Sequence, residues 1–248
     1  MRLLSFAFKD SMTPISVPLP KLSESGAIPP FIASGNWIKG LCSKVLKNAN
    51  LMDSENPRVT AVIVTRCSRG GKTSSLHELI RKVRAVDDSY ALIYVSFNSE
   101  TPVEEWENEN PLGALCKRIV FTSLNQEEQG TSRHLQFDNF KTQYDVSPAS
   151  VVKWLDTEKC ILVVDELHKI TMNEEIASSL KHNFLLRPGR GLVFSSHVVS
   201  LNSLLCEFMD GQGSGREIRT YSLPHIISMS DTNKSSTQVH CPRKRCCS

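Results

Sequence analysis

One short segment constrains the fold of this chain more than any other. Residues 65–75 read TRCSRGGKTSS; the β-branched run RVTAVIVT leads into this segment, and an amphipathic pattern follows it. A buried strand that passes through paired glycines into the first turn of a helix is the context expected of a phosphate-binding loop. The usual pattern is G-x-x-x-x-G-K-[ST], and Arg66 stands here in place of its first glycine. The segment therefore indicates either a nucleotide site or a basic turn without a ligand.

The residues of this loop suit a nucleoside triphosphate. Gly70 and Gly71 have no Cβ, so phosphate oxygens would reach the backbone N–H groups of the loop and of the helix that follows. Lys72 would contact the β and γ oxygens as a point charge, and Thr73 would offer its hydroxyl to Mg²⁺. Arg69 would add a cation facing the γ-phosphate. The predicted cofactors are ATP and Mg²⁺, with ATP the default because no N-K-x-D segment for guanine is visible.

A second segment strengthens this interpretation. The apolar run CILVVD (160–165) ends in Asp165, and Glu166 follows it. In phosphate-loop NTPases an acid at this strand end holds Mg²⁺, and a second acid beside it polarises the attacking water as a general base. His168 completes a D-E-x-H string like that of helicases. A helicase core needs two such lobes, whereas this chain has residues for one.

A third polar segment, FSSH (194–197), ends another apolar run, where polar side chains would sense the γ-phosphate. The alternative is a strand-end turn with no ligand. Arg216 or Arg219 would supply a cation to the transferred phosphate, or would simply be solvated. The predicted catalytic residues are Glu166, Lys72 and Arg216, and the predicted metal ligands are Thr73 and Asp165. The predicted cofactor-binding residues are Arg69, Gly70, Gly71, Lys72, Thr73, Ser74, Ser196 and His197.

Strand and helix patterns alternate along the chain. Strands are predicted at 58–65, 91–97, 160–165, 191–196 and 217–223. Helices are predicted at 35–48, after Lys72, from Asn110-Pro111, at 147–154, at 173–182 and near 200–208, with a polar loop at 126–145. This order indicates an α/β fold, a P-loop NTPase three-layer sandwich with a mainly parallel five-stranded sheet. The run at 91–97 lies between the two main motifs, which favours the ASCE/STAND-like class, with a strand inserted between their strands in the sheet.

The domain boundaries follow from composition. A proline-rich tail is predicted at 1–30, the NTPase domain at 31–228 and a disordered polar C-terminal tail at 229–248. The formal net charge of +3 is too small to argue for nucleic acid, so that partner stays open, and no apolar run is long enough for a membrane span. The first residues do not form a recognisable signal peptide. Eight scattered cysteines without a C-x-x-C pair predict reduced, buried thiols.

The chain resembles one known family. RCSRGGKT (66–73), SFN (96–98), WLD (154–156), LVVDEL (162–167), FSSHV (194–198) and Leu223-Pro224 are similar to the NTPase domain of the Crinkler effectors of oomycetes and fungi, and SGNWI (34–38) is similar to the segment before its first strand. The resemblance covers residues 31–228. It makes Arg66 a family variant of the loop. It also implies a secreted protein delivered to a host cell, including its nucleus, with a host protein target.

The chain departs from the family in three places. We expect no secretion and translocation header, no nuclease-like second domain, and a basic residue where Ser74 stands. The leading hypothesis is therefore an ATP-binding protein with Mg²⁺-dependent ATPase activity. The alternative is a catalytically inactive nucleotide switch or host-protein interaction module, acting by homo-oligomerisation or by occupying a partner. A nuclease lacks support, because no paired acids with a lysine occur outside the NTPase motifs.

Overall fold

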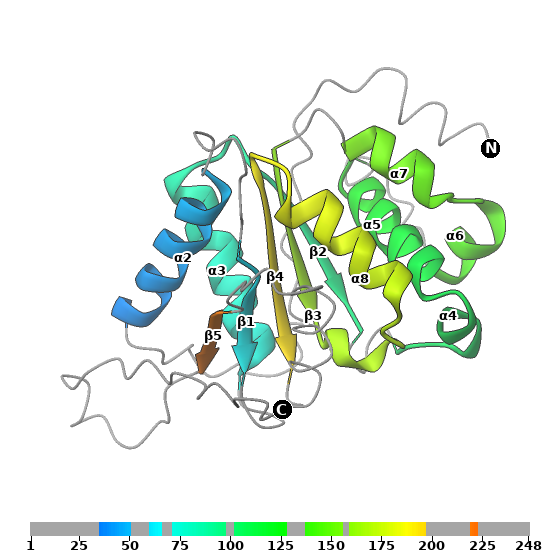
Figure 1. The fold of residues 1–248 in the computed structure, drawn as a ribbon, viewed down its shortest axis with the longest axis horizontal. Coiled ribbons are helices and arrows are strands. Elements are labelled where there is room, and N and C mark those ends of the chain that lie inside the picture. The colour runs from blue at the N-terminus through cyan, green and yellow to red at the C-terminus, as the bar shows by residue number, and fades with distance from the viewer. Residues whose placement is uncertain are drawn as a thin grey trace, which may run out of the picture.

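The computed structural model describes residues 35–50, 60–65, 71–97, 102–127, 137–155, 159–196 and 219–222. Five strands run through the middle of the molecule and helices cover both faces (Figure 1). The predicted tails, the helix near 200–208, the loop residues 66–70, His197 and Arg216 lie outside the described residues. No helix among those described is long and apolar enough to cross a bilayer.

The sheet is parallel in every pairing and its strands lie in the order β2-β3-β4-β1-β5. The strands are β1 (Val62–Thr65), β2 (Ala91–Ser96), β3 (Cys160–Asp165), β4 (Arg190–Ser196) and β5 (Arg219–Ser222). The first four are described with their side chains and β5 by its backbone. The predicted three-layer α/β sandwich is confirmed. The predicted insertion is also present, because β4 separates the strand before the glycine loop from the strand that carries Asp165.

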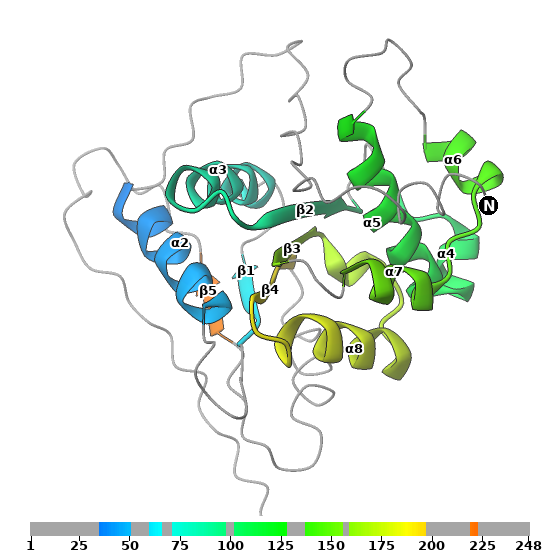
Figure 2. The ribbon, with the colours of Figure 1, turned by 90° about the horizontal axis from the view of Figure 1, so that it is seen from above.

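The strands form because their β-branched and apolar side chains bury both faces of the sheet, as parallel sheets require. Alternate residues enter two separate cores. In β3, Leu162 and Val164 pack under α5, α7 and α8, whereas Ile161 and Val163 pack under α2 and α3. Figure 2 shows these helices as two layers on either side of the sheet. The next side chain on the α3 face after Val163 is Asp165.

The helices largely follow the predicted periodicity, with three corrections. The predicted polar loop at 126–145 is wrong in part, because α5 runs to Glu127 and a short helix, α6, occupies 137–143. The polar sequence hid α6, whose Phe137 and Phe140 pack on Phe121. Two short elements were not predicted, α4 and a 3₁₀ turn at 167–169. The helices are α2 (Gly35–Ala49), α3 (Lys72–Val86), α4 (Glu105–Glu109), α5 (Pro111–Glu127), α6 (Phe137–Gln143), α7 (Pro148–Leu155) and α8 (Glu174–Leu180), which a π-helical turn (Lys181–Leu185) extends.

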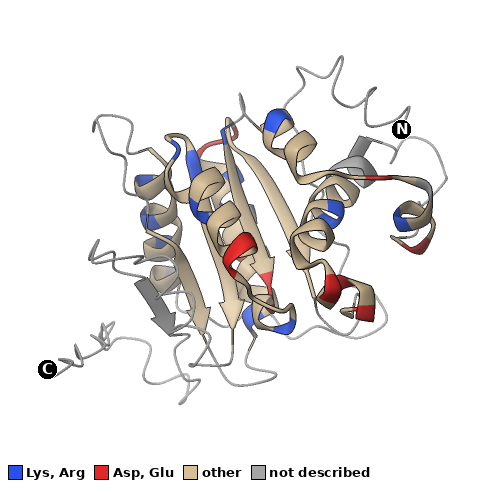
Figure 3. Ribbon diagram, turned by 45° about the vertical axis from the view of Figure 1, so that its right-hand side comes forward, with Lys and Arg blue, Asp and Glu red and all other residues tan. Residues whose placement is uncertain are grey.

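Charge is nearly absent from the sheet (Figure 3). Among the four strands with described side chains, the charged residues are Arg190 at the start of β4 and Asp165 at the end of β3. Asp165 is fully buried. An ionised carboxylate is costly to bury without partners, so its position at a strand end requires hydrogen-bond donors around it.

The cysteines that the structure describes agree with the prediction of reduced thiols. Cys42, Cys116 and Cys160 are buried and free. Burial, with the nearby Glu175 charge, raises the pKa of the Cys116 thiol to about 12. Burial also raises the pKa of Cys42, against the opposing effect of Lys82. Protonated, buried thiols of this kind act as small apolar side chains.

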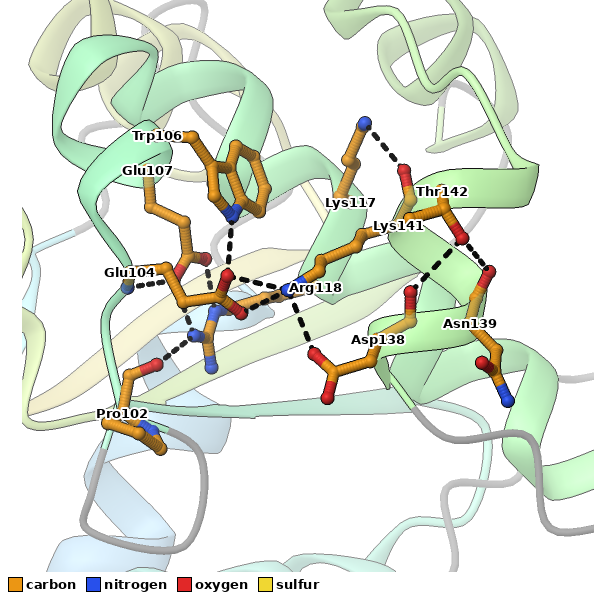
Figure 4. A network of polar contacts seen from close by, with 10 residues as sticks. All are labelled: Pro102, Glu104, Trp106, Glu107, Lys117, Arg118, Asp138, Asn139, Lys141 and Thr142. Atoms are coloured by element: carbon orange, nitrogen blue, oxygen red, sulfur yellow. Dashed lines mark hydrogen bonds and ion pairs between the residues drawn. The ribbon is translucent and has the colours of Figure 1, made fainter.

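A buried ion pair fixes the end of β2 to the helical layer (Figure 4). Arg118 on α5 donates from Nε and Nη2 to the two carboxylate oxygens of Glu107 on α4, each at 2.7 Å. The same guanidinium donates to the Ser96 carbonyl at 2.7 Å and the Pro102 carbonyl at 2.9 Å. It also lies over the Phe97 ring at 4.5 Å. Since Phe97 N–H donates to the Asp165 carbonyl, this cluster reaches the end of β3.

Candidate nucleotide-binding site

The carboxyl ends of the parallel strands meet at one edge of the sheet, the lower edge in Figure 1, and α3 begins there. Gly71 precedes α3 as its N-cap, with φ 80° and ψ 20°. This left-handed conformation favours glycine, and open space surrounds the position that a Cβ would take. The Gly71 carbonyl accepts from the N–H of Ser75 at 2.9 Å and from its hydroxyl at 2.7 Å, which starts the helix.

Gly71→Ala tests this turn separately from crowding. We expect a loss of about 1–2 kcal/mol in the free energy of unfolding, because an L side chain is strained at this φ. Gly40→Ala is the matched control, since Gly40 lies inside α2 with equally open space around it. There alanine should add up to about 1 kcal/mol through helix propensity. Urea unfolding followed by circular dichroism measures both, and changes of the same sign would contradict the backbone argument.

The first turn of α3 brings two predicted groups to the two acids. Thr73 Oγ1 donates to Asp165 Oδ2 at 2.6 Å, between segments 92 residues apart. Lys72 Nζ lies 3.5 Å from Glu166 Oε1, and both side chains are largely buried. The sequence-based prediction that the glycine loop and the acidic strand end form one site is therefore confirmed for these four residues. Ser74 lies beside them on α3, half-buried.

Asp165 is surrounded by hydroxyl groups from three elements. Besides Thr73 on α3, Ser195 on β4 donates to Oδ1 at 2.5 Å, and Tyr94 on β2 donates to Oδ2 at 3.3 Å. All three lie on the α3 face of the sheet or on α3 itself. These donors offset the cost of burying the carboxylate and hold its orientation.

Glu166 has the one positive φ among the described non-glycine residues, at 60°. In a continuing strand its side chain would point to the face opposite Asp165. The left-handed backbone ends the strand instead, and the carboxylate comes within reach of Lys72. Its other oxygen, Oε2, lies 3.4 Å from His168 Nε2 and 3.7 Å from Lys169 Nζ. A strained conformation of this kind costs about 1–2 kcal/mol, so the surrounding contacts must maintain it.

Sequence reasoning selected the wrong serine for contact with the acids. Both Ser195 and Ser196 are fully buried at the end of β4, but the hydroxyl that contacts Asp165 is that of Ser195. The roles predicted for Ser196, His197, Arg69, Gly70 and Arg216 stay predictions. Tyr94 was missed as well. Strand alternation would have placed both missed residues on the face of Asp165, but only once the pairing of β2, β3 and β4 was known.

The oxygen groups at this edge fit a hydrated magnesium ion. Mg²⁺ is usually held by one or two carboxylates, waters and substrate phosphates, and not by a cage made entirely of protein ligands. Thr73 and Asp165 present a hydroxyl and a carboxylate side by side. Within the described ranges no group of three or more His, Cys, Asp or Glu side chains is placed to hold a metal. A site completed by nucleotide phosphates needs no such group.

Comparisons with known proteins give limited help. No family model and no curated protein matches the chain. Similar folds occur in Drosophila ORC bound to poly(dA/dT) DNA and Cdc6 (11% identity over 77% of this chain), in Drosophila ORC bound to GC-rich DNA and Cdc6 (14% over 78%) and in the Aeropyrum pernix ORC2 protein in ADPNP–ADP complexes (15% over 81%). Each has a TM-score of 0.45. This chain spans 29% of the two Drosophila chains and 50% of the Aeropyrum chain.

Proposed function

We propose that this chain binds ATP together with Mg²⁺ at the strand ends next to α3 and hydrolyses it. The observation that carries the proposal is the joining of the two motifs, with Thr73 bonded to Asp165 at 2.6 Å and Lys72 beside Glu166 at 3.5 Å. One pair supplies the oxygen ligands that a metal prefers, and the other supplies a cation for phosphate and a base for water. The buried position of all four would shield the reaction from bulk solvent.

Each residue has a defined part in this mechanism. Lys72 and the N-terminus of α3 would hold the phosphates, and Thr73 and Asp165 would hold the metal. Bound Mg²⁺ would neutralise charge on the β and γ phosphate oxygens. Glu166 would accept a proton from the attacking water as the oxygen–phosphorus bond forms and the bond from the γ-phosphorus to its bridging oxygen breaks. Occupation of Lys72 by phosphate would free Glu166 Oε1 for this water, while Oε2 stays near His168.

Lys72→Ala tests the binding part of the proposal. Each charge-assisted hydrogen bond lost costs about 1.5–3 kcal/mol, so we expect the Kd for ATP to rise about 10- to 100-fold. Equilibrium binding of a fluorescent ATP analogue measures this. Lys82→Ala is the control, since Lys82 lies further along the same helix, away from the acids. ATP binding that is indifferent to Lys72 would reject the site.

A second candidate function is a nucleotide switch without turnover. The pairing of Lys72 with Glu166 favours it, because phosphate binding would exchange one partner of Lys72 for another and release Glu166. Stable ATP binding without phosphate release, even at high protein concentration, would favour the switch over the enzyme. Analytical ultracentrifugation with and without ATP would show whether a change in oligomeric state accompanies binding.

We also propose the effector role that the Crinkler resemblance implies. Its support is the string RCSRGGKT, in which Arg66 departs from the general loop pattern as the family does. The role predicts delivery to a host cell and a host protein target. Expression of the tagged chain in host cells, followed by imaging and affinity capture, tests it. The lysine variant would show whether capture depends on the nucleotide site.

A further inference from the structure

The hydroxyl of Ser195 joins the two acids of the site. It donates to Asp165 Oδ1 at 2.5 Å and accepts from the backbone N–H of Glu166 at 2.9 Å. Ser195 is fully buried near the end of β4, one residue beyond the register pair Val164↔Phe194. A hydroxyl has one proton to donate and two lone pairs to accept with, so a single side chain makes both bonds at once.

These two bonds act on different parts of the proposed chemistry. The bond to Oδ1 fixes the rotation of the Asp165 carboxylate and leaves Oδ2 on the side of Thr73, where the metal would be held. The bond from the Glu166 N–H supports the left-handed backbone at φ 60° that turns the side chain toward Lys72. Without this acceptor a buried donor would lose its partner in a conformation that L residues rarely adopt.

We propose that Ser195 is a positioning residue that sets metal holding and water activation together. The inference rests on the proposed function, and it predicts a loss that a merely structural serine would not cause. Groups that orient metal ligands are commonly worth about 10- to 100-fold in metal affinity or activity. Ser195→Ala should therefore weaken both the Mg²⁺-dependent gain in ATP affinity and the turnover rate by about that factor. Binding of ATP in EDTA, which depends on Lys72 and the loop, should not change.

The experiment compares Ser195→Ala and Ser195→Thr with wild type. Threonine keeps the hydroxyl and should restore the Mg²⁺-dependent gain. Val193→Ala is the control, because Val193 lies on the same strand and the same face and is fully buried, and its truncation leaves a small cavity without touching either acid. Should the alanine variant fail to fold, Ser195→Cys fills the space with a poor hydrogen-bonding group and carries the same expectation.

A second measurement needs no nucleotide. Amide hydrogen exchange of Glu166, followed by NMR, should become at least about tenfold faster in Ser195→Ala and stay at the wild-type rate in Val193→Ala, since only the first variant removes the hydrogen-bond acceptor. Wild-type exchange at Glu166 together with a wild-type Mg²⁺-dependent gain in Ser195→Ala would overturn the inference. Wild type that binds no ATP would instead refute the proposed function, while the exchange rates still decide whether Ser195 holds Glu166.

Discussion

Glu166→Gln is expected to bind ATP as well as wild type, or more tightly, while its turnover falls by about 10²- to 10⁴-fold, the usual contribution of a general base. Glutamine keeps the size of the side chain but accepts no proton at neutral pH. The substitution also removes the negative charge 3.5 Å from Lys72 Nζ, so the ammonium becomes more available to phosphate. Binding and turnover should therefore separate in this variant, which distinguishes an enzyme from a switch.

The measurements are the Kd for a fluorescent ATP analogue and the rate of phosphate release under saturating ATP and Mg²⁺. Glu109→Gln is the matched control, because Glu109 is an exposed acid at the end of α4. Turnover that persists in Glu166→Gln would show that another group activates the water. Loss of ATP binding would show that Glu166 holds the site together and does not act on the water.

Arg118→Ala is expected to lower the free energy of unfolding by about 3–5 kcal/mol, the usual result of breaking a buried ion pair. The substitution leaves the Glu107 carboxylate, which is fully buried, without its bidentate partner. It also removes the donors to the Ser96 and Pro102 carbonyls. Urea unfolding followed by circular dichroism measures the loss.

The chain contains a matched control for this prediction. Arg81 and Glu78 on α3 form the same bidentate pair, at 2.8 and 2.6 Å, but on the surface. Exposed pairs contribute little, so Arg81→Ala should leave the stability almost unchanged. The double variant Arg118→Met with Glu107→Leu should be more stable than either single variant, because neither charge is then left unpaired. Equal losses from Arg118→Ala and Arg81→Ala would contradict the role assigned to burial.

Much of the sheet was predictable because its strands are short apolar runs between helices of clear period. The pairing of Thr73 with Asp165 followed from the rule that parallel strand ends share an edge. The choice between Ser195 and Ser196 did not follow, since it depends on which face of β4 meets β3, and the sequence does not state the strand order. The backbone turn at Glu166 was equally hidden, because glutamate gives no local signal for a positive φ.

The position of β4 has a consequence for how this protein is made. β1 pairs with β4 and β5, and β3 pairs with β2 and β4, so the two halves of the site have no direct contact within the sheet. A chain emerging from the ribosome carries both sequence motifs long before residues 190–196 arrive to join them. Fragments that stop short of these residues would still read as nucleotide-binding proteins by sequence, yet they would lack the strand that brings lysine and acid together.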